Sequence, residues 1–437
     1  MLPRIVYGRH EDFSISRKPF ILKPKDFIQR HWQAVLLTLL AAAVFCYWYW
    51  LYPYVIVMRE TAVLFLLNAD YFMERIVVPG GFAQYVGESI VQFFQNPLSG
   101  AITYAVLFVL VQQLTSVWLR RLLPVLKPLW RFVLALIPSL LLWRVAMIPS
   151  VPLTPTIAVV LVLGAGCLVL SLKRYSRLAA LCLLIPLMYW LAGPAAVLLL
   201  LCYLRWVPLT ACLLALCVMG SSYLAPYPLR VVAQGIDYMW SEEKPMGTYE
   251  EMECDMLVRM RAWDEILMKF RNPESPAVQS AFLLATYQTG QISQGELLGR
   301  MIATPGSADY TPSVLTRGRQ HLIVNFGSLP SAFMVSDIAL LMNLPNISQR
   351  AVFEAMEFIP NYNKSGRALK RLVETAVITG QYALARKYLA ILEESIVYRD
   401  WAQSMRPLVE HPEQINGHRL YEKSREVYEN TEDMFFL

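Results

Sequence analysis

The sequence predicts an all-α protein, in which a polytopic transmembrane helix bundle is followed by a tetratricopeptide-like α-solenoid domain. Residues 34–225 form a series of long apolar segments separated by short joints of Arg, Lys, Pro or Gly. No Asp or Glu occurs between Glu88 and Asp237. Long apolar stretches without acidic residues are typical of membrane-spanning helices. After residue 226 the apolar residues follow helical spacing in a polar background, which predicts a soluble helical domain.

Charge is divided unevenly between the two halves. Residues 1–225 carry 18 Lys and Arg against 7 Asp and Glu, whereas residues 226–437 carry 21 against 26. The net charge of +6 therefore comes from basic joints between apolar segments, and it does not indicate a nucleic-acid partner. Six of the seven cysteines lie in apolar segments, and no Cys/His spacing or phosphate-binding motif is present. The sequence thus predicts no metal and no cofactor.

The first apolar segment follows a basic leader. Residues 1–33 hold seven Lys and Arg against three acidic residues, and the apolar run then extends from Ala34 to Val57. By the positive-inside rule, the leader is cytoplasmic. The aromatic residues 47–54 predict the far membrane interface.

Residues 58–97 are predicted to form an external segment, and all four acidic residues near the bundle are found there: Glu60, Asp70, Glu74 and Glu88. After a turn at residues 79–81, helical spacing places apolar residues on one face and polar ones on the other. The apolar set is Phe82, Tyr85, Val86, Ile90, Phe93 and Phe94; the polar set is Gln84, Glu88, Gln92 and Gln95. Such a helix either lies flat on the outer interface or packs on the mouth of the bundle.

Further spans are predicted at Leu98–Trp118, Phe132–Ile148, Thr156–Leu172 and Val207–Ala225. The intervening residues 178–204 form either two short spans around Gly193-Pro194 or one long kinked span. The first alternative gives seven spans and a C-terminal domain outside the inner membrane, in the periplasm. The second gives six spans and a cytoplasmic domain. Seven is favoured, because Arg205 then joins the other basic joints on the inner side.

The C-terminal half, residues 226–437, shows a degenerate helical repeat. Similar stretches centre on Trp263, Ile292, Ile347 and Tyr382, and the last two are 35 residues apart, close to the tetratricopeptide period of 34. Gly366 to Glu394 should form a helical hairpin with Gly380 at the cap of its first helix. Leu369, Leu372, Val373 and Ala376 should face Tyr382, Ala385, Leu389 and Leu392. Lys370 and Arg371 are predicted to be exposed and free to bind an acidic partner.

Several motifs together carry a family resemblance. They are the aromatic residues 47–54 before Arg59-Glu60, the motifs at residues 70–72, 79–81, 92–94 and 349–356, and residues 367–372 leading into 379–382. On these motifs the chain resembles a family of uncharacterised multi-pass inner-membrane proteins of Bacteroidota with C-terminal helical repeats. The resemblance implies a location in the cell envelope and no known activity.

Two functions follow as hypotheses. The first is a membrane-anchored scaffold that contacts membrane lipids and presents its helical arm to a protein partner. The alternative is an envelope glycosyltransferase-like enzyme acting on a lipid-linked substrate, with Asp70 as its main catalytic candidate and Glu74 and Glu88 behind it. A coupled transporter is disfavoured, because the spans after residue 98 contain no carboxylate. Arg144 is the one charge well inside a span; it either reaches the interface or contacts an anionic ligand.

Overall fold

The computed structural model describes residues 24–224, 228–235, 246–293, 295–297, 314–316, 320–322, 327–359 and 364–431. Regular structure in these ranges is helical, with one addition to the all-α prediction. Strand β1 (Val314–Thr316) pairs antiparallel with β2 (Gln320–Leu322), and Leu315 lies opposite His321. Most of the basic leader, residues 1–23, lies outside the described residues.

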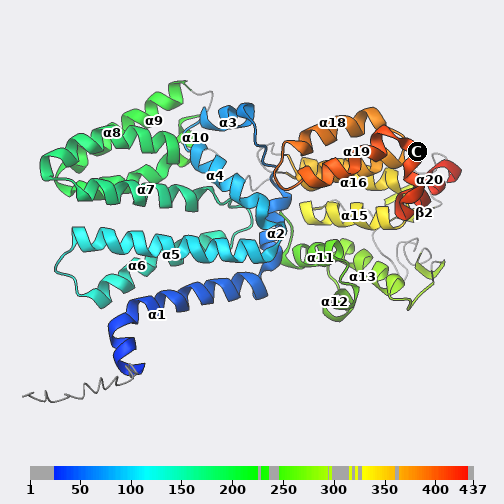
Figure 1. Ribbon diagram of the computed structural model, residues 1–437, viewed down its shortest axis with the longest axis horizontal. Coiled ribbons are helices and arrows are strands. Elements are labelled where there is room, and N and C mark those ends of the chain that lie inside the picture. The colour runs from blue at the N-terminus through cyan, green and yellow to red at the C-terminus, as the bar shows by residue number, and fades with distance from the viewer. Residues whose placement is uncertain are drawn as a thin grey trace, which may run out of the picture.

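The N-terminal half is a bundle of apolar helices closed at one end by shorter ones (Figure 1). Its elements are α1 (Pro24–Cys46), the π-helical turn η1 (Tyr47–Leu51), α2 (Pro53–Thr61), α3 (Ala69–Ile76), α4 (Gly81–Val91), the 3₁₀ turn η2 (Gln92–Gln95), α5 (Pro97–Leu122), α6 (Pro128–Ala146), α7 (Thr154–Ser171), α8 (Arg174–Ala192), the 3₁₀ helix η3 (Gly193–Trp206), α9 (Val207–Leu224) and α10 (Leu229–Gln234).

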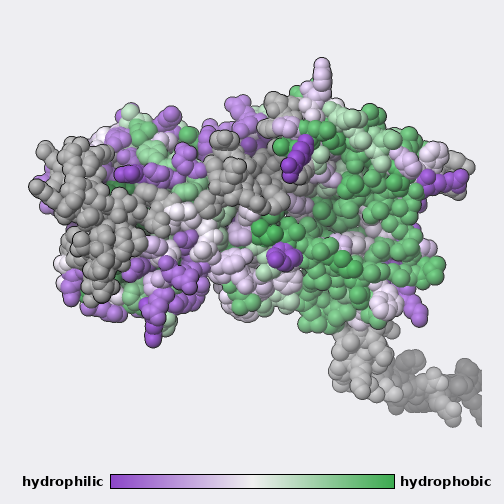
Figure 2. Space-filling view, turned by 180° about the vertical axis from the view of Figure 1, so that it is seen from behind, coloured by the Kyte–Doolittle hydropathy of each residue, from purple (hydrophilic) through white to green (hydrophobic). Residues whose placement is uncertain are grey.

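Five runs among the described residues are long and apolar enough to cross a membrane: 32–51, 97–122, 128–146, 154–171 and 176–224. The last run, 49 residues long, contains α8, η3 and α9, each of which packs on the other two. The chain reverses at Gly193, whose φ of 62° suits glycine, and η3 then packs back along α8 and α7. Residues 178–204 therefore fold as two segments. Figure 2 shows hydrophobic residues gathered over the bundle and hydrophilic residues over the other half.

The first apolar run is shorter than its predicted extent to Val57. The helix ends at Leu51, and Tyr52 leaves helical geometry with φ −134° and ψ 43°. Pro53 then starts α2, because a proline suits the first turn of a helix but not its interior. This break turns residues 53–61 away from α1, and Figure 1 shows α2 across the end of the bundle.

Helix α4 packs on the bundle end, which was one of the two predicted arrangements, and its polar face points inward. Its polar residues Gln84 and Glu88, and Gln92 just beyond, are 3%, 6% and 4% exposed, whereas Phe93 is 49% exposed. The polar face packs toward the start of α7 and toward Arg59 of α2. Of the apolar residues, Phe94 is fully buried, whereas Phe82, Tyr85, Val86 and Ile90 are half-buried. The rule that apolar residues face inward fails here, because the interior that α4 meets is polar.

The C-terminal half is a stack of helices that pack mostly in chain order. Its elements are α11 (Tyr249–Met260), α12 (Trp263–Lys269), α13 (Pro276–Gln288), the strands, α15 (Leu329–Leu341), α16 (Pro345–Glu357), α17 (Gly366–Ile378), α18 (Tyr382–Glu393), α19 (Arg399–Glu410), the 3₁₀ turn η5 (Pro412–Gly417) and α20 (Arg419–Thr431). Helix α15 is central: α11, α13 and α16 all pack on it, and all its residues except Leu341 are buried.

The hairpin predicted between Gly366 and Glu394 is confirmed as α17 and α18. Leu369, Leu372, Val373 and Ala376 are buried on α17, and Ala385, Leu389 and Leu392 are buried on α18. Gly380 follows the end of α17 with φ 76°, a left-handed conformation that glycine adopts without strain.

We expect Ala385→Phe to destabilise this hairpin. Ala385 is fully buried between α17 and α18, so a phenyl ring would overpack the contact and lower stability by about 1–3 kcal/mol. Ala383 on the same helix is exposed, and Ala383→Phe is the matched control. Thermal unfolding of the full chain in mild detergent checks the prediction: equal melting temperatures for the two variants would contradict it.

Candidate functional site

The two halves of the protein meet at α2 and the segment that follows it. The Leu67 amide donates to the Glu394 carbonyl oxygen at 3.0 Å, and Asn68 Nδ2 donates to Glu394 Oε2 at 2.5 Å. On the other side of α2, the Tyr249 hydroxyl donates to the Met147 carbonyl oxygen at 3.2 Å. Contacts at α11 and after α18 thus fasten the helical stack to the bundle end.

Glu60 lies at the centre of this contact. Its carboxylate, 1% exposed, accepts from Arg259 Nη1 at 3.2 Å, from Gln95 Nε2 at 3.2 Å and from the Tyr398 hydroxyl. Arg259 lies on α11 and Tyr398 directly precedes α19. A carboxylate of the bundle half therefore binds two elements of the C-terminal half at once.

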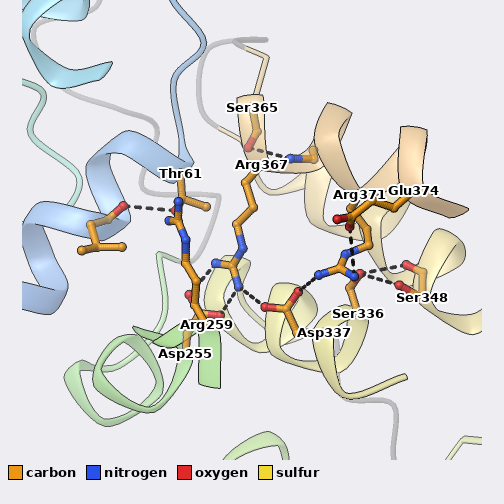
Figure 3. Close-up of polar contacts among 12 residues, drawn as sticks. Thr61, Asp255, Arg259, Ser336, Asp337, Ser348, Ser365, Arg367, Arg371 and Glu374 are labelled. Atoms are coloured by element: carbon orange, nitrogen blue, oxygen red, sulfur yellow. Dashed lines mark hydrogen bonds and ion pairs between the residues drawn. The ribbon is translucent and has the colours of Figure 1, made fainter. Parts of the chain in front are cut away.

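A second buried ion-pair network lies inside the stack, next to Arg259 (Figure 3). Asp255, one turn before Arg259 on α11, accepts two hydrogen bonds from the Arg367 guanidinium at 2.7 and 2.8 Å. Arg367 also donates to Asp337 on α15 at 2.7 Å, and Arg371 binds Asp337 as well. We call Glu60, Arg259, Asp255, Arg367, Asp337 and Arg371 the ionic junction.

Burial and ion pairing have opposite effects on the pKa values of the two aspartates, Asp255 and Asp337. Burial raises the pKa of Asp255, and the facing Arg367 offsets this only in part. Burial also opposes ionisation of Asp337, but Arg367 and Arg371 together outweigh it and hold the pKa of Asp337 below its ordinary value. Bidentate and doubly paired guanidinium contacts are the geometry in which buried charges remain stable.

Local sequence signals position these side chains. Ser365 caps α17 by accepting from the Ala368 amide, which sets Arg367 in the first turn, facing α11 and α15. Gly366 leaves room for Tyr398: a Cβ atom at this position would lie 2.1 Å from Tyr398 Cε2. On α11, Thr248 and Glu251 form a capping box that fixes the start of the helix.

Lys370 and Arg371 do not have the exposure predicted for them. Arg371 pairs with Asp337 and, at 3.2 Å, with Glu374. Lys370 is half-buried, and its Nζ lies 4.9 Å from the centre of the Trp401 ring. Helix α17 is covered on a second face, because it packs on α16 and α20 as well as on α18.

The acidic residues of segment 58–97 fall into two environments. Asp70 and Glu74 are exposed on α3, and Glu74 contacts only the neighbouring Arg75 among the pairs that the structure describes. Glu88 is buried on α4 and accepts from the Tyr71 hydroxyl at 2.7 Å, Arg75 Nε at 2.9 Å and Gln84 Nε2 at 3.0 Å. Burial and the adjacent Glu88 raise the pKa of Tyr71.

Glu88 borders a small pocket between α2, α4 and the start of α7. The other polar residues of its wall are Arg59, Gln84 and Thr154, and its apolar wall includes Val63, Val91 and Leu153. Asp70 and Glu74 do not line this pocket, so the structure separates the three acidic candidates.

Arg144 lies exposed in the last turn of α6, two residues before Ala146, whose carbonyl oxygen accepts from Arg59. Its position is at the bundle end that α2 crosses. Across the described ranges, no group of three or more His, Cys, Asp or Glu is arranged to hold a metal ion.

The sequence does not reveal the ionic junction, although it singles out Glu60 as an external acid and Arg371 as an exposed cation. A signal was present in α15, where Asp337 is the single charge in the apolar stretch from Leu329 to Leu341. A lone carboxylate in a helix too short to span a membrane indicates a buried partner. The identity of that partner needed the three-dimensional arrangement of α11 and α17.

Comparison with known proteins gives one match. Residues 29–437 match the model described as "Family of unknown function (DUF6057)". No curated protein and no solved structure matches the chain.

Proposed function

Because the chain belongs to the DUF6057 family, whose function is unknown, its role has to be argued from its geometry, and we propose that it is a membrane-anchored scaffold. In this proposal the apolar bundle lies in the inner membrane of a Bacteroidota-type envelope. The C-terminal stack acts as a tetratricopeptide-like arm that holds a protein partner at the membrane surface.

The observation that carries the proposal is the ionic junction. A flexible tether would meet the bundle through exposed contacts, whereas here Glu60 is 1% exposed and accepts from Arg259 and Tyr398 of the arm. Hydrogen bonds to a charged group contribute about 1.5–3 kcal/mol each, so the contacts of Glu60 hold the arm in one orientation relative to the bundle. A scaffold needs its binding arm in a fixed orientation, whereas a simple membrane anchor does not.

The arrangement of basic residues supports the placement of the arm outside the cytoplasm. Arg120 and Arg121 end α5, and Arg177 and Arg205 lie near the start of α8 and the end of η3. The opposite ends of α6 and α8 contact α2 and α3, where the arm is attached. By the positive-inside rule, the basic end is cytoplasmic and the arm is periplasmic.

Reporter fusions test this topology. We expect alkaline phosphatase fused after Tyr238 to be active and the same reporter fused after Arg131 or Arg177 to be inactive. Fluorescent-protein fusions at the same positions should give the opposite pattern. Phosphatase activity after Arg131 or Arg177 contradicts the orientation, and its absence after Tyr238 contradicts the periplasmic arm.

Affinity purification of the full chain in mild detergent tests the scaffold itself. Since Lys370 and Arg371 are engaged internally, the exposed stripe of α16 is the better first surface to perturb: Arg350, Phe353 and Glu357 are exposed there, Phe353 by 45%. We expect a stoichiometric protein partner whose recovery falls with Phe353→Asp and not with Glu429→Gln on α20. Recovery of the chain without any stoichiometric partner, from cells cross-linked before lysis, contradicts the scaffold.

One observation supports the enzyme alternative, with Glu88 in place of Asp70 as the catalytic candidate. Glu88 combines burial with a pocket wall, whereas Asp70 is exposed and lines no described pocket. An envelope glycosyltransferase-like enzyme built on this chain would therefore use Glu88. Normal function of a Glu88→Gln variant at normal abundance argues against this alternative and leaves the scaffold untouched.

A further inference from the structure

Helix α5 carries two adjacent carboxamides, Gln112 and Gln113, inside an apolar run. Apart from Gln33 at the start of the first run, they are the only Asn or Gln residues in the five apolar runs. Gln113 lies seven residues before Arg120, about 10 Å along the helix at 1.5 Å per residue. Because basic residues mark the inner interface, Gln113 lies at hydrocarbon depth in the proposed membrane.

The Gln113 amide is only partly satisfied within the chain. Its Nε2 group donates to Gln112 Oε1 at 3.0 Å. A carboxamide has two N–H groups and an acceptor oxygen, so one N–H group and the oxygen of Gln113 have no partner among the described residues. The buried Gln112 Nε2 group also has no acceptor in the described ranges. Hydrocarbon offers no water to replace these bonds, so an unpaired amide is costly there.

Gln113 belongs to the exposed face of α5. This face also contains Ile102, Val106 and Leu110, which precede Gln113 at helical spacing and are exposed as it is. The other faces of α5 pack on α1, α6 and α7. The exposed face is therefore an apolar strip with one carboxamide in it. Lipid chains can cover the apolar side chains, but they cannot hydrogen-bond the amide.

We propose that this face of α5 packs on the same face of a second copy of the chain, about a two-fold axis along the membrane normal. In such a pair, the free N–H group of each Gln113 donates to the Oε1 atom of the other, and both amides are satisfied. A different membrane helix would need its own polar group at this depth, whereas a second copy supplies one by symmetry. Carboxamides in membrane spans hydrogen-bond across helices in this way. The inference rests on the proposed membrane placement.

Photo-cross-linking of the full chain in intact cells tests the contact. We expect p-benzoylphenylalanine in place of Val106 to give a product of twice the chain mass that contains this chain alone. The same photoreactive residue in place of Leu216 on α9 is the matched control, because Leu216 is as exposed as Val106, and it should give no such product. If Val106 cross-links only to a different protein, or gives no protein cross-link, the proposal is wrong.

Energy transfer between donor- and acceptor-labelled full chains in liposomes measures the contribution of the amide. We expect Gln113→Leu to raise the dissociation constant of the dimer at least about tenfold, a change of about 1.4 kcal/mol. Leucine suits a lipid-facing position, so this variant should fold. Thr38→Val is the matched control: Thr38 is exposed on α1, but its hydroxyl donates to the Ala34 carbonyl oxygen of the same helix, so association should not change.

Equal dissociation constants for Gln113→Leu and wild type would contradict the amide contact. Flotation with the liposomes shows whether the chain inserts. A chain that floats with the liposomes but stays monomeric overturns the dimer and leaves the proposed scaffold intact, whereas a chain that does not insert overturns the membrane placement on which both depend.

Discussion

Arg367→Met should lower the stability of the C-terminal stack more than any other single change within it. The substitution removes the guanidinium that joins Asp255 to Asp337 and leaves a buried carboxylate on α11 unpaired. Such a loss costs about 3–5 kcal/mol. Thermal unfolding of the full chain in detergent, followed with a probe in the stack, should show a clearly lowered melting temperature.

Two control variants distinguish the loss of the Arg367 charge from a general disruption of the fold. Arg406→Met removes a guanidinium that pairs with Glu393 on the surface, and we expect no measurable shift from it. Adding Asp255→Asn to Arg367→Met should recover part of the loss, because a neutral side chain no longer needs the counter-charge. If Arg367→Met melts at the wild-type temperature, the buried network does not stabilise the fold.

Glu60→Gln should uncouple the two halves while leaving each of them folded. Gln keeps the shape of the side chain but removes the charge that faces Arg259 and the buried Tyr398 hydroxyl. Hydrogen bonds to a charged group contribute about 1.5–3 kcal/mol each, and the quarter-exposed Arg259 places the expected loss within this range. Hydrogen exchange should therefore rise in α2, α11 and the segment before α19, and stay unchanged in α5 and α7.

The exposed acids beside the junction are the controls. Asp70→Asn and Glu74→Gln alter the same segment at the surface and should leave exchange at wild-type levels. A double-mutant cycle of Glu60→Gln with Tyr398→Phe measures the coupling directly. Additive effects of these two substitutions would show that Glu60 and Tyr398 do not act together.

The apolar segments and the α17–α18 hairpin were predictable because their signals are local. Spans depend on runs of apolar residues, and the hairpin on helical spacing and Gly380. Residues 178–204 were ambiguous for the same reason: Gly193 and Pro194 permit either a kink or a reversal. Packing of η3 against α7 decides between the two, and no local pattern encodes it.

The differences for α4 and α17 share one physical cause: the sequence of a helix does not state what packs on each of its faces. For α4, the spacing separates a polar from an apolar face but does not say which one meets the interior, and Arg59 and the start of α7 make that interior polar. For α17, one covered face was assumed and the layered stack provides two, so Arg371 is enclosed. The candidate site could not be predicted from the sequence, because its residues lie far apart in the chain. Asp255 follows Glu60 by 195 residues and Arg367 follows it by 307.

Helix α15 has a consequence for how the chain is made. It spans 13 residues, about 20 Å at 1.5 Å per residue, which is shorter than the hydrocarbon core of a bilayer at about 30 Å. A segment this apolar but this short follows the last of the five long apolar runs and is too short to span a bilayer. Helices α11 and α13 precede it in the chain, but the side that packs on α16 stays uncovered until α16 is synthesised, so a chain interrupted near residue 345 should be recognised by quality-control proteases rather than accumulate.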